Sequence, residues 1–183
     1  CRGSRFADGA KRNPNGEVFM KNRETNEWLK QNNRSTRNFI RKWGHFVKHD
    51  ALLKPIVPPK YDIGFVIRDC NEQLLELLEP WCSTIYIDTF AEDYINKEQP
   101  DTMFDLTKRI YSIDADVQND IEVRFDGTKF TNNSFNIIQQ LSEILANDTE
   151  LNGIEPEEFE LDVFEITINN LQTYEEELIK CER

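Results

Sequence analysis

A strand–helix–strand pattern between residues 61 and 88 constrains the fold of this chain most. The near-continuous apolar run from Tyr61 to Ile67 is typical of a strand that is covered on both faces. A short helical segment, Asn71 to Glu79, stops at Pro80, and a second strand pattern follows from Ser83 to Asp88. Strands joined by a helix through short connections lie parallel. We therefore expect an α/β fold that contains a small Rossmann-like parallel β-α-β unit.

The residues that follow predict a C-terminal α+β unit. Residues 121–125 alternate between apolar and polar, as in a strand, and Ser134 is the expected cap of a helix. We expect one strand over residues 159–168, with a bulge or bend between Val163 and Phe164, because the apolar phase slips there by one residue. Further helices are expected over residues 104–111 and 171–181.

Charge divides the chain near Lys60. Residues 1–60 carry 14 Lys+Arg and 5 Asp+Glu, a net of +9, whereas residues 61–183 carry 8 and 29, a net of −21. The proline-rich connector 54–60 coincides with this break, so we expect a domain boundary there. The expected parts are a basic loop and helical segment over 1–53, the β-α-β unit over 61–115 and the acidic α+β unit over 116–183. Their opposite charges predict that the basic half docks on the acidic half.

The basic segment predicts one helix over residues 24–30 and a second from the cap Ser35 to about His49. One stripe of the second helix is apolar, and the opposite side carries a cationic ridge. The ridge consists of Arg34, Arg37, Arg41 and Lys48. Such cations bind the phosphates of nucleic acids or sugar nucleotides, or dock the acidic half of the same chain. The net charge of −12 disfavours nucleic acid as the partner.

Three aspartates are the candidate binding residues of the acidic portion. Asp88 ends the second strand, where open parallel sheets bind ligands, although the loop after the first strand has no glycine-rich phosphate motif. Asp114 and Asp116 form an Asp-x-Asp triplet, the arrangement that holds Mg²⁺ or Mn²⁺ against a diphosphate. A solvated linker explains the same triplet. The two histidines, His45 and His49, lack the neighbours of a zinc motif.

Targeting and redox features predict a cytoplasmic protein without a membrane span. The longest apolar runs are far shorter than the roughly 20 residues that cross a bilayer. The four cysteines are widely spaced, as in a chain whose thiols stay reduced.

The stretch Asn38–Gly44 resembles the end of many family 2 glycosyltransferases, in which a helix after the catalytic GT-A domain commonly reads Phe-x-x-Lys-Trp-Gly. Phe39, Lys42, Trp43 and Gly44 match that motif, and the resemblance covers about residues 17–48. It implies that this chain is the C-terminal, non-catalytic part of a glycosyltransferase-like protein that acts on nucleotide sugars.

By the same resemblance the catalytic domain and its metal motif lie upstream of Cys1, so Mg²⁺ or Mn²⁺ belongs to that domain and no cofactor to this chain. No catalytic residue carries over, and the chain contributes packing, acceptor recognition or homo-oligomer contacts. The alternative is a non-enzymatic assembly or nucleic-acid-associated module that uses the cationic ridge. A third interpretation, a small enzyme that works at Asp88, requires a pocket beside the strand ends.

Overall fold

The computed structural model describes residues 25–148, 151 and 156–173 of the chain. The chain divides into two compact units, residues 1–36 and 37–183. Helix α3 (Asn26–Trp43) begins in the first unit and ends in the second. Every other described element belongs to the second unit, which holds the candidate sites.

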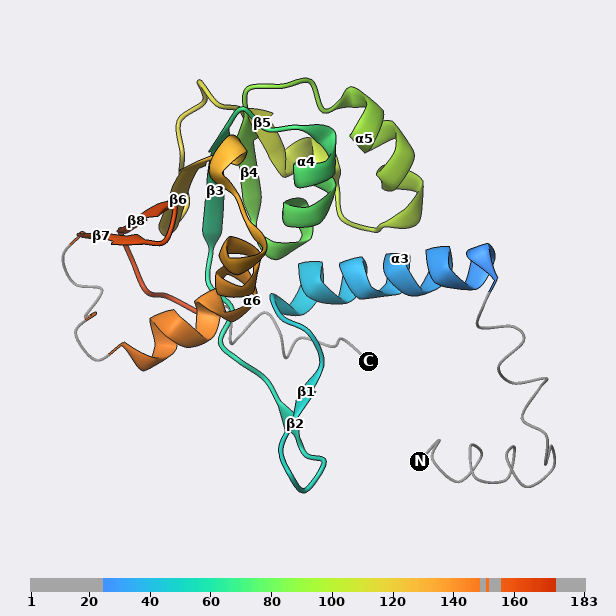
Figure 1. Cartoon of the computed structure of the whole chain (residues 1–183), viewed down its shortest axis with the longest axis horizontal. Coiled ribbons are helices and arrows are strands. Elements are labelled where there is room, and N and C mark those ends of the chain that lie inside the picture. The colour runs from blue at the N-terminus through green and yellow to red at the C-terminus, as the bar shows by residue number, and fades with distance from the viewer. Residues whose placement is uncertain (1–24, 149–150, 152–155, 174–183) are drawn as a thin grey trace. The chain divides into compact units, whose positions relative to one another are not determined.

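A mixed sheet forms the centre of the second unit (Figure 1). Within the described residues it has six strands in the order β5-β4-β3-β6-β8-β7. Strands β3, β4, β5 and β6 are parallel, whereas β8 is antiparallel to both of its neighbours, β6 and β7. Their bounds are β3 (Ile63–Arg68), β4 (Thr84–Ile87), β5 (Ile110–Ser112), β6 (Ile121–Asp126), β7 (Glu157–Leu161) and β8 (Phe164–Ile168).

The α/β class is thus confirmed, as is the parallel β3–α4–β4 unit. Strands on both sides of residue 115 pair directly, because β3 lies next to β6. The two predicted units, 61–115 and 116–183, therefore share one sheet and one hydrophobic core.

The core lies between the sheet and its helices. The helices are α4 (Glu72–Leu78), α5 (Glu92–Glu98) and α6 (Asn132–Asn147). Short 3₁₀ turns cover Glu79–Trp81, Gln99–Asp101, Leu106–Lys108 and Gly127–Lys129. Leucines of α4 and α6 pack with alternate residues of the strands, such as Phe65, Val123 and Ile166, which are neighbours in register. The alternation of β6 is therefore apolar toward the helices and polar on the other face.

Two helices begin where local chemistry dictates. Asn71 caps α4, and its side chain accepts a hydrogen bond from the backbone N–H of Leu74 at 2.9 Å. Helix α6 is capped by Thr131, so the prediction that Ser134 is the cap was wrong by three residues. Ser134 instead completes a capping box, because its hydroxyl accepts a hydrogen bond from the backbone N–H of Thr131.

The phase slip near Val163 is a hairpin turn. Two antiparallel strands, β7 and β8, replace the single strand expected over residues 159–168. Asp162 has a φ of 58°, which reverses the chain between Leu161 and Phe164. The prediction of one bent strand was therefore wrong. It arose because a two-residue turn shifts the phase of the apolar side chains by one residue, as a bulge does.

The basic segment also differs from its prediction. One helix, α3, covers Asn26–Trp43 without a break, so Ser35 is an interior residue and no cap. The helix ends at Gly44, whose φ is 77° and whose backbone N–H donates to the carbonyl of Ile40. His45 and His49 therefore follow the helix and do not share a helical face. His45 is buried and His49 is exposed.

A short antiparallel hairpin follows, built from β1 (Lys48–His49) and β2 (Pro55–Ile56). It occupies part of the segment expected as a proline-rich connector. The helix expected over 104–111 is absent, and a 3₁₀ turn and strand β5 stand in its place. Most of the helix expected over 171–181 falls outside the described residues. None of the described helices is long and apolar enough to cross a membrane.

Candidate functional site

The switch point of the sheet lies between β3 and β6. From β3 the chain goes to β4 and β5 on one side, and it then crosses to β6 on the other side. Open α/β sheets bind ligands at such a point, beyond the carboxyl ends of the strands. A pocket of about 390 Å³ lies there, lined by Arg68, Asp69 and Asp126 at the strand ends and by Arg124, Lys129 and Glu165 beside them. Its charged lining is balanced, with three cations and three carboxylates.

The loop after β3 is closed by Asp88, the residue that follows β4. The Asp88 carboxylate accepts hydrogen bonds from the backbone N–H groups of Asp69 at 2.6 Å and Cys70 at 3.1 Å. Asp69 has a φ of 52°, so consecutive amides turn toward one point. In nucleotide-binding sheets the amides of this loop contact a phosphate. Here the chain's own carboxylate takes the place of that anion.

A second pocket, of about 440 Å³, lies beside Asp88; we call it the Asp88 pocket. Its lining combines aromatic and aliphatic side chains with two carboxylates and three hydroxyls. These residues are Ile87, Asp88, Thr89, Phe90, Ala91, Ile110, Tyr111, Ser112, Ile113 and Asp114. No basic residue lines it, and Phe90 is 94% exposed.

The Asp-x-Asp triplet lies just after β5. Asp114 lines the Asp88 pocket, whereas Asp116 is not part of that lining. In the described part of the chain no group of three or more His, Cys, Asp or Glu side chains is arranged to hold a metal ion. The triplet therefore has no third protein ligand there.

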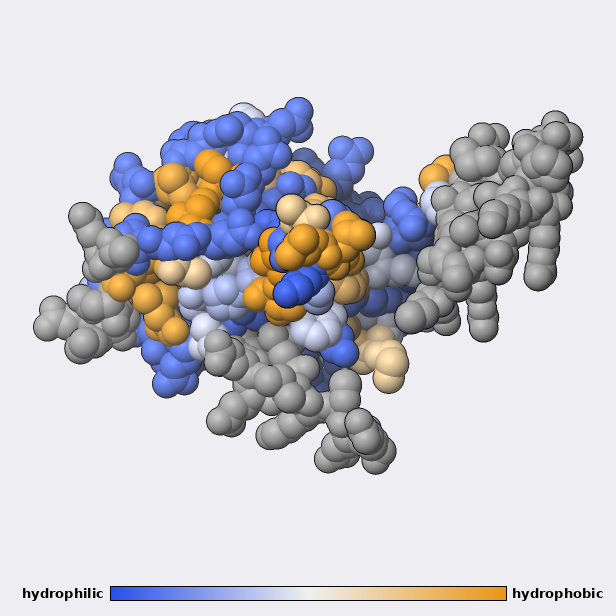
Figure 2. Space-filling view, turned by 90° about the horizontal axis from the view of Figure 1, so that it is seen from below, coloured by the Kyte–Doolittle hydropathy of each residue, from blue (hydrophilic) through white to orange (hydrophobic). Residues whose placement is uncertain are grey.

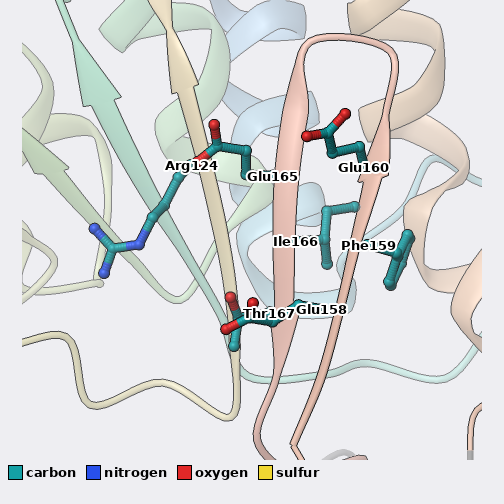
Figure 3. A pocket seen from close by; sticks show the side chains of 7 residues that line it. All are labelled: Arg124, Glu158, Phe159, Glu160, Glu165, Ile166 and Thr167. Carbon is teal, nitrogen blue, oxygen red and sulfur yellow. The ribbon is translucent and has the colours of Figure 1, made fainter.

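A third pocket, of about 470 Å³, lies on the polar face of β6, β8 and β7 (Figure 3). Arg124 extends from β6 across β3 in this view, and Glu160 and Glu165 lie near the turn of the β7–β8 hairpin. Arg124 and Glu165 are direct neighbours in register, as are Glu160 and Glu165, so these side chains share one face. Arg124 also pairs with Glu122 at 2.6 Å. Sequence reasoning missed this face, because strand alternation indicates an outward side and not what gathers on it.

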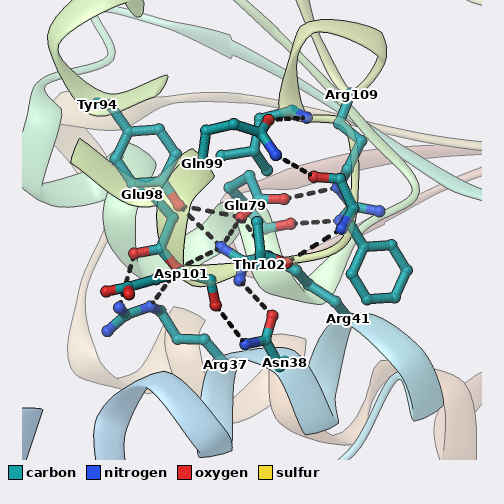
Figure 4. A network of polar contacts seen from close by, with 12 residues as sticks. Arg37, Asn38, Arg41, Glu79, Tyr94, Glu98, Gln99, Asp101, Thr102 and Arg109 are labelled. Carbon is teal, nitrogen blue, oxygen red and sulfur yellow. Dashed lines mark hydrogen bonds and ion pairs between the residues drawn. The ribbon is translucent and has the colours of Figure 1, made fainter. Parts of the chain in front are cut away.

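Two cations of the predicted ridge lie in a buried network (Figure 4). Arg41 is fully buried, and its guanidinium donates to Glu79 Oε2 at 2.6 and 2.9 Å and to Glu98 Oε1 at 2.8 Å. Arg37 donates to both oxygens of Glu98, at 2.8 and 2.6 Å. Arg109 enters from the strand side and pairs with Glu79 Oε1 at 2.6 Å. We call Arg37, Arg41, Glu79, Glu98, Arg109 and Tyr94 the arginine network.

The arginine network favours the ionised form of Glu79 and the neutral form of Tyr94. Burial alone would raise the pKa of the Glu79 carboxyl, but Arg109 and Arg41 together lower it below its ordinary value. Burial raises the pKa of Tyr94, and the Glu79 charge raises it further. The Tyr94 hydroxyl therefore stays protonated and donates to Glu79 Oε2 at 3.0 Å.

The other two ridge residues are Lys48 and Arg34. Lys48 pairs with Glu143 of α6. Arg34 lies on the portion of α3 that belongs to the first unit. Three of the four predicted cations, Arg37, Arg41 and Lys48, thus contact carboxylates of the acidic portion.

The Phe-x-x-Lys-Trp-Gly residues form the end of α3. Lys60 donates to the carbonyls of Arg41 at 2.9 Å and Lys42 at 3.2 Å, which caps the last turn. The Lys42 ammonium lies 5.1 Å from the centre of the Trp43 ring. In this chain the motif terminates a helix and contacts no pocket described above.

Glu79, Glu98 and Arg109 were missed by sequence reasoning. The partners of Arg41 lie 38 and 57 residues away, and no local pattern identifies them. One signal was present: Glu79 follows Leu75 by four residues, so at the end of the predicted helical segment 71–79 it falls on the apolar side. A carboxylate in that position needs a cationic partner.

Comparisons of this chain with protein-family models, with curated proteins and with solved structures found no match.

Proposed function

We propose that this chain is the non-catalytic C-terminal part of a glycosyltransferase-like protein that acts on nucleotide sugars, and that it serves as a supporting domain. The resemblance of residues 38–44 motivates the proposal. The observation that carries it is the arginine network, which fixes the end of the motif helix to the α/β sheet through buried ion pairs. A rigid joint of this kind suits a domain that positions a neighbour.

The carboxyl edge of the sheet supports the non-catalytic part of the proposal. Although the β3–α4–β4 unit is Rossmann-like in its parallel order, Asp88 occupies the loop amides to which a nucleotide phosphate would bind. An anion there would have to displace a carboxylate and would meet its charge. Binding of the donor nucleotide is therefore disfavoured at the loop after β3, where such a sheet ordinarily binds a phosphate.

The alternative, a nucleic-acid-associated module, depended on the cationic ridge. Arg37, Arg41 and Lys48 are engaged with Glu98, Glu79 and Glu143. Cations that neutralise carboxylates of their own chain release no counterions on binding a polyanion. The supporting role is thus the better proposal, and the assembly half of the alternative is compatible with it.

The experiment measures nucleotide release from UDP-glucose, UDP-N-acetylglucosamine, UDP-galactose and GDP-mannose, with Mn²⁺ or Mg²⁺ present. We expect the chain to give the rate of buffer alone and no saturable binding by calorimetry. Metal-dependent release that disappears in Asp114→Ala, with Asp105→Ala as the matched control, would contradict the proposal. The proposal also predicts a GT-A domain in the reading frame before Cys1, and a domain of another kind there would count equally against it.

A further inference from the structure

The β1–β2 hairpin exposes a set of apolar side chains that the rest of the described chain does not bury. We call residues 47–57 the arm. It projects from the sheet in Figure 1, and Figure 2 views it from below, where apolar residues gather at the centre. Its exposed apolar residues are Val47, Leu52, Leu53, Ile56 and Val57. Solvent exposure of this kind, gathered on one projecting element, marks an interaction surface.

The base of the arm is fixed. Phe46 packs edge-to-face on Trp81 with ring centres 4.9 Å apart, and Lys48 pairs with Glu143. The turn is closed by Asp50, whose side chain accepts hydrogen bonds from the backbone N–H groups of Leu52 and Lys54, both at 2.8 Å. The arm is therefore an ordered element that presents its tip.

Leu53 occupies a backbone position that ordinarily belongs to glycine. Its φ is 62°, and it follows a turn in which its N–H donates to the carbonyl of Asp50. A residue in the left-handed region after such a turn is usually Gly, because a branched side chain is strained there. Leu53 is 76% exposed, as is Leu52. The side chain thus causes strain without gaining burial in the single chain, which points to a use outside it.

The Asp88 pocket has the complementary character. Phe90 and Tyr111 are exposed aromatic side chains of its lining, and Asp88 and Asp114 give it negative charge without any basic residue. At the tip of the arm the exposed cation is Lys54, whereas the Asp50 carboxylate is half-buried and accepts the two backbone hydrogen bonds of the turn. One chain therefore presents an apolar projection with one exposed cation, Lys54, and an apolar pocket with two carboxylates.

We propose that the arm of one copy binds in the Asp88 pocket of a second copy. Leu52 and Leu53 pack against Phe90 and Tyr111, and Lys54 lies toward the two carboxylates. A second copy is the favoured occupant because it covers both exposed surfaces at once and matches their charges. The arm and the pocket are different surfaces, so two reciprocal contacts close a dimer and one-way contacts continue into larger assemblies. This inference is independent of the glycosyltransferase proposal.

The first experiment measures the mass of the 183-residue chain by light scattering over a concentration series. We expect concentration-dependent self-association, weakened about tenfold or more by Leu53→Gly, because that change removes the buried leucine while relieving the backbone. Unfolding in urea shows that the variant folds. Leu77→Ser removes another exposed leucine, on α4, and leaves the mass unchanged. A wild-type chain that stays monomeric throughout overturns the proposal.

The second experiment identifies the two surfaces as partners. Leu52→Asp/Leu53→Gly damages the arm, and Phe90→Asp damages the pocket, so we expect each variant alone to be monomeric. Mixed together, they retain one intact arm and one intact pocket, and they should associate with each other. Absence of association in the mixture, at the concentration where wild type associates, overturns the arm-in-pocket contact.

Vesicles of phosphatidylcholine, with and without phosphatidylserine, test the other apolar occupant. The proposal predicts no sedimentation of the chain with either vesicle. Vesicle binding by a monomeric chain that Leu53→Gly abolishes would assign the arm to a membrane surface instead.

Discussion

A few buried charged residues attach the end of α3 to the sheet. Arg41 and Glu79 are both fully buried, and each has a second charged partner, Glu98 for the arginine and Arg109 for the carboxylate. Burying such groups is costly unless every charge is matched, and here all are hydrogen-bonded. The energetic importance of the network lies in its completeness, because removal of one member leaves the others buried without a partner.

Arg41→Met should therefore destabilise the protein by about 3–5 kcal/mol, because it leaves Glu79 and Glu98 without one of their cations. The measurement is the urea midpoint, followed by tryptophan fluorescence. Lys97→Met is the matched control, since Lys97 pairs with Glu76 at the surface, and it should cost less than about 1 kcal/mol. Equal, small losses in the two variants would show that the network does not hold the helix.

At the scale of residues, the sequence identifies which side chains are charged but not which residues they contact. The amphipathic pattern places Arg41 on the face opposite the packed stripe, which was wrong, because Arg41 is fully buried whereas Phe39 and Trp43 of the stripe are half-buried. The pattern offers docking and phosphate binding as equal uses of the cations. Docking is the use that the structure shows, because Arg37 and Arg41 pair with Glu79 and Glu98, and Arg109 completes the network. These three partners come from three later segments of the chain. Contacts between segments so far apart follow from the fold and not from any local spacing.

At the scale of elements, helix and strand ends were harder to predict than their interiors. The 100° stripe of α3 continues through Phe46 and Val47, so periodicity extends the expected helix to His49. Gly44 ends the helix earlier, because it adopts a left-handed conformation that turns the chain toward β1. In β7 and β8 the periodicity was correct on both sides of Asp162, and only the cause of the slip was missed.

Gly44→Ala should destabilise the protein by roughly 1–2 kcal/mol, since a Cβ is strained at a φ of 77°. The nearest atom to such a Cβ is Lys60 Cγ at 3.4 Å, an ordinary contact, so the loss reflects backbone strain and not a clash. Gly44→Asn should lose less, because asparagine tolerates this conformation. Thermal unfolding by circular dichroism compares the two, and a larger loss for asparagine would argue against the strain explanation.

At the scale of the whole molecule, one sheet contains strands from two segments that the sequence predicts as separate units. Strand β3 pairs with β4 from the expected β-α-β unit and with β6 from the expected α+β unit. The parallel unit was predictable because its strands are buried on both faces and its helix is short. Its pairing with β6 was not, because strand order depends on packing between residues that are far apart in sequence.

Two thiols should report on the unfolding of this single core. Burial raises the pKa of Cys70, with a smaller effect from Asp88, to about 12, and burial also raises that of Cys82. In a Cys1→Ser/Cys181→Ser chain, Ellman's reagent at pH 8 should therefore react with neither thiol until the protein unfolds. The reaction rate in urea should follow the unfolding rate measured by fluorescence. Rapid labelling of Cys70 without urea would indicate local opening at the end of β3.

The Asp88 carboxylate also distinguishes this sheet from an anion-binding one. Both of its oxygens accept backbone amides of the β3–α4 loop, so the loop conformation persists only while some acceptor is present. A replacement by serine or glycine would leave those amides to an incoming anion. The difference between a loop whose amides are already satisfied and one that can receive a phosphate is then a single side chain, and no strand has to change.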